Sequence, residues 1–252
     1  MMETEARYRR LRWYNAIMGL VHAAQGVAIL ALSNDFALPV TATFMEGPPG
    51  TPPALVELFA VAIGPAVAAF VFLSAAAHGI LVLPGVFGWY RRNLERNRNY
   101  ARWIEYSVSS SIMIVLIAML TGIADVAALI AIFGVNSSMI LFGWLMEKYE
   151  QPGHPNWLAY WFGVIAGAVP WVVIGLYLWS PTTAAEPPAF VYAIFISLFI
   201  FFNSFAVNMI LQYRRVGPWR DYLFGEAVYV LLSLTAKSAL AWQVFAGALA
   251  SG

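Results

Sequence analysis

The chain has no cysteine and little charge. None of its 252 residues is cysteine, and 11% are charged, whereas 61% are hydrophobic. Without cysteine the protein has no disulfide, no thiolate metal ligand and no cysteine nucleophile. Its three histidines, His22, His78 and His154, are too far apart in sequence to predict a metal cluster. A composition this apolar is typical of membrane proteins.

Long apolar runs account for most of the chain, and each is long enough to cross a bilayer, which takes about 20 helical residues. They predict seven membrane-spanning helices, at residues 12–32, 58–83, 101–121, 125–146, 157–179, 189–212 and 223–248. We therefore expect an all-α membrane protein, a seven-helix bundle that forms one domain over residues 1–252. We see no nucleotide-binding loop and no catalytic triad, so we expect neither an enzyme nor a nucleic-acid partner.

Basic residues follow an alternating pattern along the chain. All but one of the 14 lysines and arginines lie in the N-terminal tail or in the second, fourth and sixth connections, and the exception is Lys237. Because basic loops stay on the cytoplasmic side, the pattern predicts a cytoplasmic N-terminus and an extracellular C-terminus. The place of the first run in this pattern also favours an uncleaved helix over a signal peptide.

Lys237 lies near the centre of the last apolar run. A charged amine there costs on the order of 3 kcal/mol, so such lysines are candidates for function. The side chain reaches only about 6 Å, while each end of the helix lies roughly 15 Å away, which disfavours a snorkelling lysine. Two readings remain: a lysine in an ion pair, or a desolvated amine that forms a Schiff base with an aldehyde. In a membrane, retinal is the obvious lipophilic aldehyde.

A buried ammonium requires a counter-charge. Glu105 is the best candidate, and Ser109 lies one helical turn away on the same face. Glu226 is a weaker rival that we read as an acid at the start of a helix. Five more polar residues are expected at similar depth, and together they predict one hydrated polar cluster. These are His22, Gln25, Ser74, His78 and Ser233.

The connections carry two further signals. In the first outer connection, 33–53, alternating β-prone residues at 40–44 precede the turn sequence Gly47-Pro48-Pro49-Gly50, so we expect a short β-hairpin. The connection at 88–102 holds five arginines and one glutamate. It is either a solvated loop or a contact for anionic lipid headgroups.

Two spans have features that bear on a ligand pocket. Pro170 should kink the fifth span and can open room for a ligand. Phe199 and Phe202 share one face of the sixth span with Asn203, so they line a pocket or face lipid.

These residues together resemble a known family. A lysine in the seventh span, with Arg102, Glu105 and Ser109 in the third, is similar to microbial retinal proteins. Four segments look more specifically like heliorhodopsins, and the likeness extends along essentially the whole chain. They are Ser33-Asn34-Asp35-Phe36-Ala37-Leu38-Pro39, Ile104-Glu105-Tyr106-Ser107-Val108-Ser109-Ser110-Ser111, Ile132-Phe133-Gly134-Val135-Asn136 and Ala236-Lys237-Ser238-Ala239-Leu240-Ala241-Trp242-Gln243.

The resemblance implies a set of roles. Lys237 would carry all-trans retinal as a protonated Schiff base, with Glu105 as the counterion. His22 and His78 match a cytoplasm-side polar cavity, with Gln25, Ser74 and Ser233 nearby. The first outer connection matches a segment that covers a homodimer partner. The implied retinal pocket consists of Trp103, Tyr106, Asn136, Met139, Trp161, Pro170, Phe199 and Phe202.

The resemblance also implies a light-sensing photoreceptor. Retinal proteins that pump protons carry a second acid one turn before the lysine and a proton donor 11 residues after the counterion; here these positions are Ser233 and Leu116. We therefore expect a signalling protein, with a light-driven ion transporter as the alternative. A third possibility is a regulator that docks an unidentified cytoplasmic partner on the 88–102 connection. Expected partners are otherwise retinal, membrane lipid and a second copy of the chain.

Overall fold

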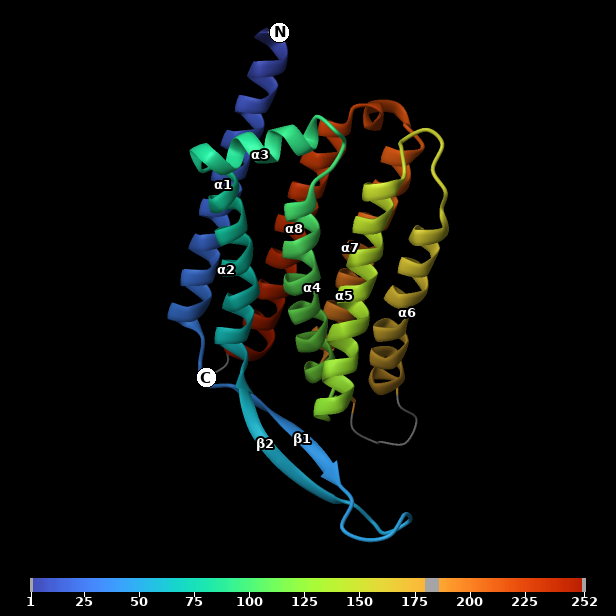
Figure 1. The fold of residues 1–252 in the computed structure, drawn as a ribbon. Helices are drawn as coiled ribbons and strands as arrows, with labels where there is room; N and C mark the ends of the chain where they lie inside the picture. The colour runs from blue at the N-terminus through green and yellow to red at the C-terminus, as the bar shows by residue number, and fades with distance from the viewer. Residues whose placement is uncertain (1, 180–185, 251–252) are drawn as a thin grey trace.

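The computed structural model describes residues 2–179 and 186–250, and its helices are those of a seven-span membrane protein. Each of seven helices is long and apolar enough to cross a bilayer (Figure 1), which confirms the predicted seven-helix bundle. They are α1 (Met2–Leu32), α2 (Ile63–Leu81), α4 (Tyr100–Leu120), α5 (Val126–Tyr149), α6 (Leu158–Leu178), α7 (Ala189–Tyr213) and α8 (Tyr222–Val244). A π-helical turn, η2 (Phe245–Leu249), extends α8.

The helices run alternately up and down, so the connections gather at two ends. We call the end with the N-terminus and α3 the basic end, and the end with the two strands the hairpin end (Figure 1). Helices adjacent in sequence pack side by side: α1 with α2, α4 with α5, α5 with α6, and α7 with α8. The tight turn between α4 and α5 uses Gly122 at φ +96°, and the Asp125 side chain caps α5. This confirms that the third and fourth spans are antiparallel neighbours.

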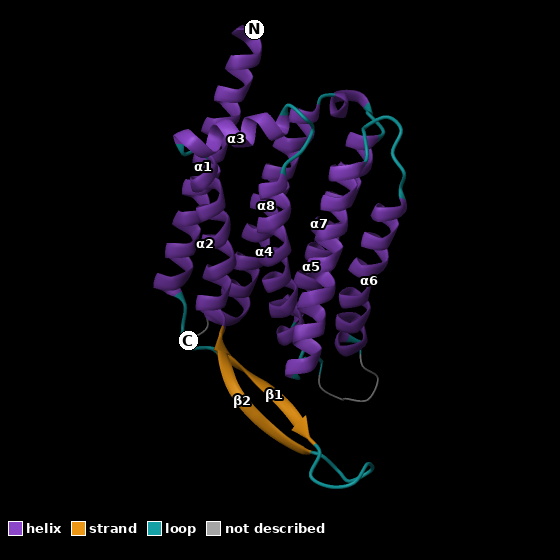
Figure 2. Cartoon of the chain, viewed as in Figure 1, coloured by secondary structure: helices purple, strands orange, loops and turns teal. Residues whose placement is uncertain are grey.

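The arginine-rich connection at 88–102 is not simply a loop, because it begins inside a helix. Helix α3 (Pro84–Leu94) lies across the basic end (Figure 2), and Pro84 occupies its first turn, where a missing N–H costs nothing. Tyr90 and Leu94, four residues apart, face inward and pack on Tyr8 and Leu11 of α1. The neighbouring arginines make this apolar stripe hard to recognise in the sequence.

The β-hairpin is longer than the sequence indicated. Strand β1 (Ala37–Phe44) pairs antiparallel with β2 (Ala54–Ala62), and a bulge lies between Val40 and Thr41. The predicted start of the second span at 58 is therefore wrong, since residues 58–62 are in β2 and α2 begins at 63. A short apolar run fits a strand as well as a helix, and pairing with β1 decided between them.

The hairpin contacts the bundle near the α4–α5 turn and extends beyond it (Figure 2). The Thr41 N–H donates to the Ala124 carbonyl at 2.8 Å, next to the α4–α5 turn. Val40 and Ala42, on the same strand, are buried, and Val40 joins the main apolar cluster of the bundle. That cluster includes Ile114 and Leu240.

Candidate functional site

Lys237 makes an ion pair inside the bundle. Its side chain is buried, and Nζ lies 3.1 Å and 3.4 Å from the two carboxylate oxygens of Glu105. Nζ also donates to the Ser233 hydroxyl, one turn earlier on α8, at 2.8 Å. Glu105 in turn accepts from the Ser74 hydroxyl of α2 at 2.6 Å. Three helices thus supply one cation, one anion and two hydroxyl groups in direct contact.

The two histidines pack against each other beside this ion pair. The His22 and His78 rings stack at 5.8 Å between centroids. His78 Nδ1 lies 2.8 Å from Asn15 Oδ1, which orients its ring. His22 is fully buried, and neither of its ring nitrogens bonds to a group in the described part of the chain. The stack therefore places two imidazole rings next to the buried Lys237–Glu105 ion pair.

Two residues predicted for the polar cluster differ from the rest. Gln25 is partly exposed and accepts a hydrogen bond from Trp242 Nε1 at 3.2 Å. Ser109 is fully buried, and its hydroxyl has no partner within residues 2–179 and 186–250. Ser109 instead lines a larger cavity that also reaches Lys237.

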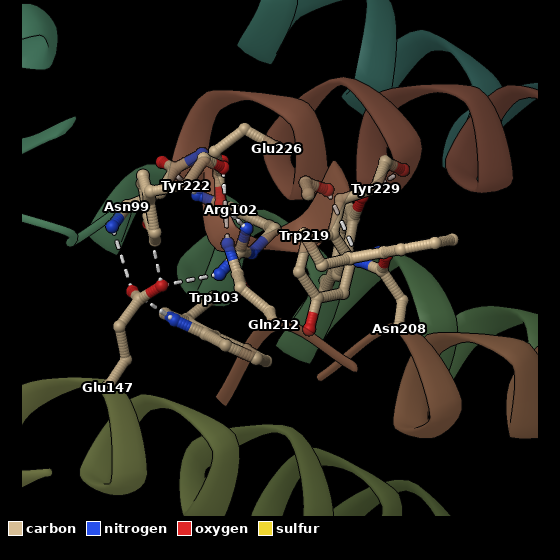
Figure 3. A network of polar contacts seen from close by, with 12 residues as sticks. Asn99, Arg102, Trp103, Glu147, Asn208, Gln212, Trp219, Tyr222, Glu226 and Tyr229 are labelled. Atoms are coloured by element: carbon tan, nitrogen blue, oxygen red, sulfur yellow. Dashed lines mark hydrogen bonds and ion pairs between the residues drawn. The ribbon is translucent and has the colours of Figure 1, made fainter. Parts of the chain in front are cut away.

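A second buried ion cluster lies closer to the basic end, and the sequence did not reveal it. Arg102 pairs with Glu147 at 2.6 Å and also with Glu226, and all three side chains are buried (Figure 3). Glu147 accepts further bonds from Trp103 Nε1 at 2.6 Å and the Tyr222 hydroxyl at 2.8 Å. We refer to Arg102, Glu147 and Glu226 as the arginine cluster.

Glu226, the alternative counterion, is part of the arginine cluster. Its carboxylate accepts hydrogen bonds from Arg102 and from the Asn99 side-chain amide, the latter at 2.7 Å (Figure 3). Its carboxylate is thus balanced by a cation other than Lys237. The sequence could have indicated a buried acid near Arg102, because an arginine at the start of a span needs one. It could not have indicated which acid that is.

A cavity of about 280 Å³ begins at Lys237 and extends between α4, α5, α6, α7 and α8. Five residues of the predicted pocket line it: Trp103, Tyr106, Met139, Phe199 and Phe202. Trp171 closes one side, with its ring 5.4 Å from those of Phe199 and Phe202 and at a steep angle to both. The wall is otherwise mostly apolar.

Three residues of the predicted pocket do not line the cavity. Trp161 is 58% exposed on the outside of α6. Asn136 is buried but donates to the Ser110 and Ser111 hydroxyls at 2.9 and 3.0 Å, behind the wall. Pro170 is buried next to Trp171, which reaches the cavity in its place.

Residues that sequence reasoning missed supply the rest of the wall. On α6 these include Tyr160, Gly163 and Gly167. The glycines let the helix approach α5 closely, since a Cβ at 167 would lie against the Met139 side chain. Their spacing of four residues placed them on one face, and that was a signal available in the sequence. Met209 of α7 and Tyr229 of α8 could be assigned only from the packing.

The cavity suits a lipophilic aldehyde such as retinal. Its volume is near the lower limit of ligand pockets, which is about 300 Å³. Aromatic rings from four helices provide flat apolar walls. Lys237 is the one lysine that lines it, so a carbonyl carbon at this end would meet a single primary amine.

Comparison with known proteins agrees with this geometry. Among curated proteins, none matches the chain significantly. The heliorhodopsin family profile matches residues 11–249, a stretch that includes nearly all of the seven spans and both members of the Lys237–Glu105 pair. The chain therefore belongs to the heliorhodopsin family and is a retinal-binding rhodopsin of the membrane.

Proposed function

We propose that the protein is a light sensor in which Lys237 holds all-trans retinal as a protonated Schiff base and Glu105 is its counterion. The observation that carries this proposal is the buried Lys237–Glu105 pair at the end of an aromatic cavity. Retinal supplies the absorption of visible light and the change of shape that follows. The residues of the chain supply the charge, the orientation and the enclosure.

Glu105 would stabilise positive charge at Nζ of Lys237, because it is the one carboxylate paired with that nitrogen among the described residues. Ser233 accepts from Nζ and keeps it directed at Glu105, while Ser74 donates to Glu105 and orients its carboxylate. Neither serine carries charge, so each positions the pair without replacing the carboxylate.

The absence of charge beyond the pair favours a sensor over a transporter. On the hairpin side of Glu105 and Lys237, the described helices contain no Asp, Glu, Lys or Arg. Many of the side chains packed there belong to the main apolar cluster, which includes Leu116 and Ile117 of α4 and Leu240 of α8. An ion moving through this half would lose its hydration without a compensating charge, which costs several kcal/mol or more.

Transport can be measured directly. The protein with retinal is reconstituted into vesicles, and the internal pH and the current are followed under continuous light. The sensor proposal expects no sustained change in either. A sustained light-driven pH change or current would show that the transporter alternative is correct.

The attachment site has a simple test, because the chain contains two lysines, Lys148 and Lys237. Lys237→Ala should abolish the visible absorption band of protein incubated with all-trans retinal, since no buried amine remains. Lys148→Ala, at the far end of α5, should leave the band in place. A visible band that survives Lys237→Ala but disappears in Lys148→Ala would place the Schiff base at Lys148.

We further propose that the basic end is cytoplasmic and that two copies associate through their hairpins in the cell membrane. The distribution of arginines supports the orientation. Exposed apolar side chains on the hairpin, such as Leu55 and Phe59, support the association. A cytoplasmic signalling partner would bind the basic end, where α3 and its arginines lie. A light-dependent pull-down from cell extract would detect such a partner.

A further inference from the structure

Tyr90 has no place in the proposed function, yet its hydroxyl is buried without a partner. The side chain is 1% exposed, and the hydroxyl makes no hydrogen bond of normal geometry within residues 2–179 and 186–250, although the Asn15 side chain lies near it. An unsatisfied buried hydroxyl is unfavourable enough that such groups normally bind water. Burial raises the pKa of Tyr90, so the phenol stays neutral and can donate.

The Tyr90 side chain lines a small polar cavity that also reaches Glu105. The cavity has a volume of about 30 Å³, which is enough for ordered water. Tyr90 is the residue of α3 that lines it. Titratable and polar groups from α1, α2, α4 with its capping residue, and α8 face the same space, and they are Asn15, Ser74, His78, Asn99, Arg102, Glu105, Tyr106 and Glu226.

Helix α3 is tied to α1 on its outer side but reaches the interior through Tyr90. Arg91 bridges Glu5 of α1 at 2.7 Å and Glu95 at 2.9 Å, and its guanidinium lies over the Tyr8 ring. The next residue in the chain thus holds the exposed face of α3, while Tyr90 faces the cavity. A change of hydrogen bonding in the cavity would therefore occur beside α3, a helix on the surface of the molecule.

We propose that Tyr90 is a positioning residue that couples α3 to Glu105 through water in this cavity. The inference rests on the proposed function, since light would alter the charge balance at Glu105. Tyr90 donates to the water, and the water donates to the carboxylate or to a neighbour hydrogen-bonded to it. When the balance at Glu105 changes, the bridge changes, and α3 loses or gains an anchor on its inner face.

The test compares Tyr90→Phe with the matched control Tyr8→Phe in full-length protein loaded with retinal. Tyr8 lies in the same apolar cluster but does not line the cavity. Light-minus-dark infrared difference spectra should contain a tyrosine band that disappears in Tyr90→Phe and persists in Tyr8→Phe. Hydrogen exchange of residues 84–94 in the dark should rise about fivefold in Tyr90→Phe, the change that corresponds to loss of one ordinary hydrogen bond.

Identical difference spectra in wild type and Tyr90→Phe would overturn the inference, whatever the exchange rates show. If Tyr90→Phe fails to fold, Glu105→Gln replaces it, and the tyrosine band should then weaken because the acceptor has lost its charge. An unaltered band in Glu105→Gln would equally overturn the coupling. Failure of the proposed function is distinguishable, because it would appear as a sustained light-driven pH change or current in vesicles, whatever the tyrosine band does.

Discussion

Lys237 and Arg102 are both buried cations, and the protein neutralises them differently. Lys237 has one carboxylate and one hydroxyl in contact and lies over the Tyr106 ring. Arg102 has two carboxylates and lies over the Trp103 and Tyr229 rings. Guanidinium can engage several acceptors at once, which suits a fixed structural cluster. A single amine with one carboxylate is the simpler pair to convert into a Schiff base and its counterion.

The role of Glu105 can be tested through colour. In the ground state its carboxylate holds positive charge near Nζ, and excitation moves that charge away along the polyene. Glu105 therefore stabilises the ground state more than the excited state, so Glu105→Gln should shift the band to longer wavelength wherever the Schiff base stays protonated. Absorption spectra across pH provide the measurement.

Glu226→Gln is the matched control for Glu105→Gln, because it removes a buried carboxylate that pairs with Arg102 instead. Its band should stay close to that of wild type. A shifted Glu226→Gln together with an unshifted Glu105→Gln would identify Glu226 as the counterion.

Arg102 should matter more for stability than for colour. Arg102→Ala leaves Glu147 and Glu226 buried without their cation, and breaking a buried pair in this way costs about 3–5 kcal/mol. Arg92→Ala removes an exposed arginine of α3 and should change the free energy of unfolding by less than about 0.5 kcal/mol. Unfolding in detergent, followed by circular dichroism, compares the two. Equal stability of both variants would show that the arginine cluster adds nothing to the fold.

At the scale of elements, close contact between α4 and α5 shapes the cavity. Helix α5 has a glycine, Gly143, where the Trp103 ring of α4 packs against its backbone. The indole N–H of Trp103 is fixed by Glu147 on the next turn of α5. The ring is therefore held between an ion cluster and a cavity wall, with little freedom to move.

Gly143→Ala should narrow the cavity. A Cβ at 143 would lie 2.5 Å from the Trp103 ring, so the ring must move, and overpacking of this kind costs about 1–3 kcal/mol. We expect weaker retinal uptake by the apoprotein, measured by titration of the visible band. Gly134→Ala on the same helix is the control, since its Cβ would meet nothing within 4 Å. Equal uptake by the two variants would contradict the expected narrowing.

For the whole molecule, the absence of cysteine makes the membrane orientation easy to measure. Glu46→Cys places a thiol in the exposed hairpin loop, and Arg96→Cys places one just after α3 at the basic end. A membrane-impermeant maleimide added to intact cells should label Glu46→Cys and leave Arg96→Cys unlabelled. The reverse pattern would invert the proposed orientation.

Much of the architecture was predictable because a bilayer imposes simple length and polarity rules. Seven spans followed from the apolar runs, and the antiparallel third and fourth spans followed from a connection too short for any other packing. Depth favoured Glu105 over Glu226 as the partner of Lys237, since a buried cation must find an acid at its own level. The structure agrees with each of these.

Other features depended on contacts between segments far apart in the chain. Residues 58–62 became a strand because β1 pairs with them, and α3 is a helix whose inner face packs on α1. Trp161 faces outward although Tyr160 lines the cavity, because the rotation of α6 is set by its packing on α5.

The sequence by itself determined the membrane class and the number of spans, and it favoured Glu105 as the partner of Lys237, because these depend on hydrophobic length and on the cost of an unpaired buried charge. Only the tertiary structure decided that Glu226 belongs to Arg102, which side chains surround the cavity, and that Tyr90 shares a polar space with Glu105. Those outcomes depend on how each helix is rotated about its axis. Rotation is set by packing against neighbours distant in sequence, and no local pattern of residues encodes it.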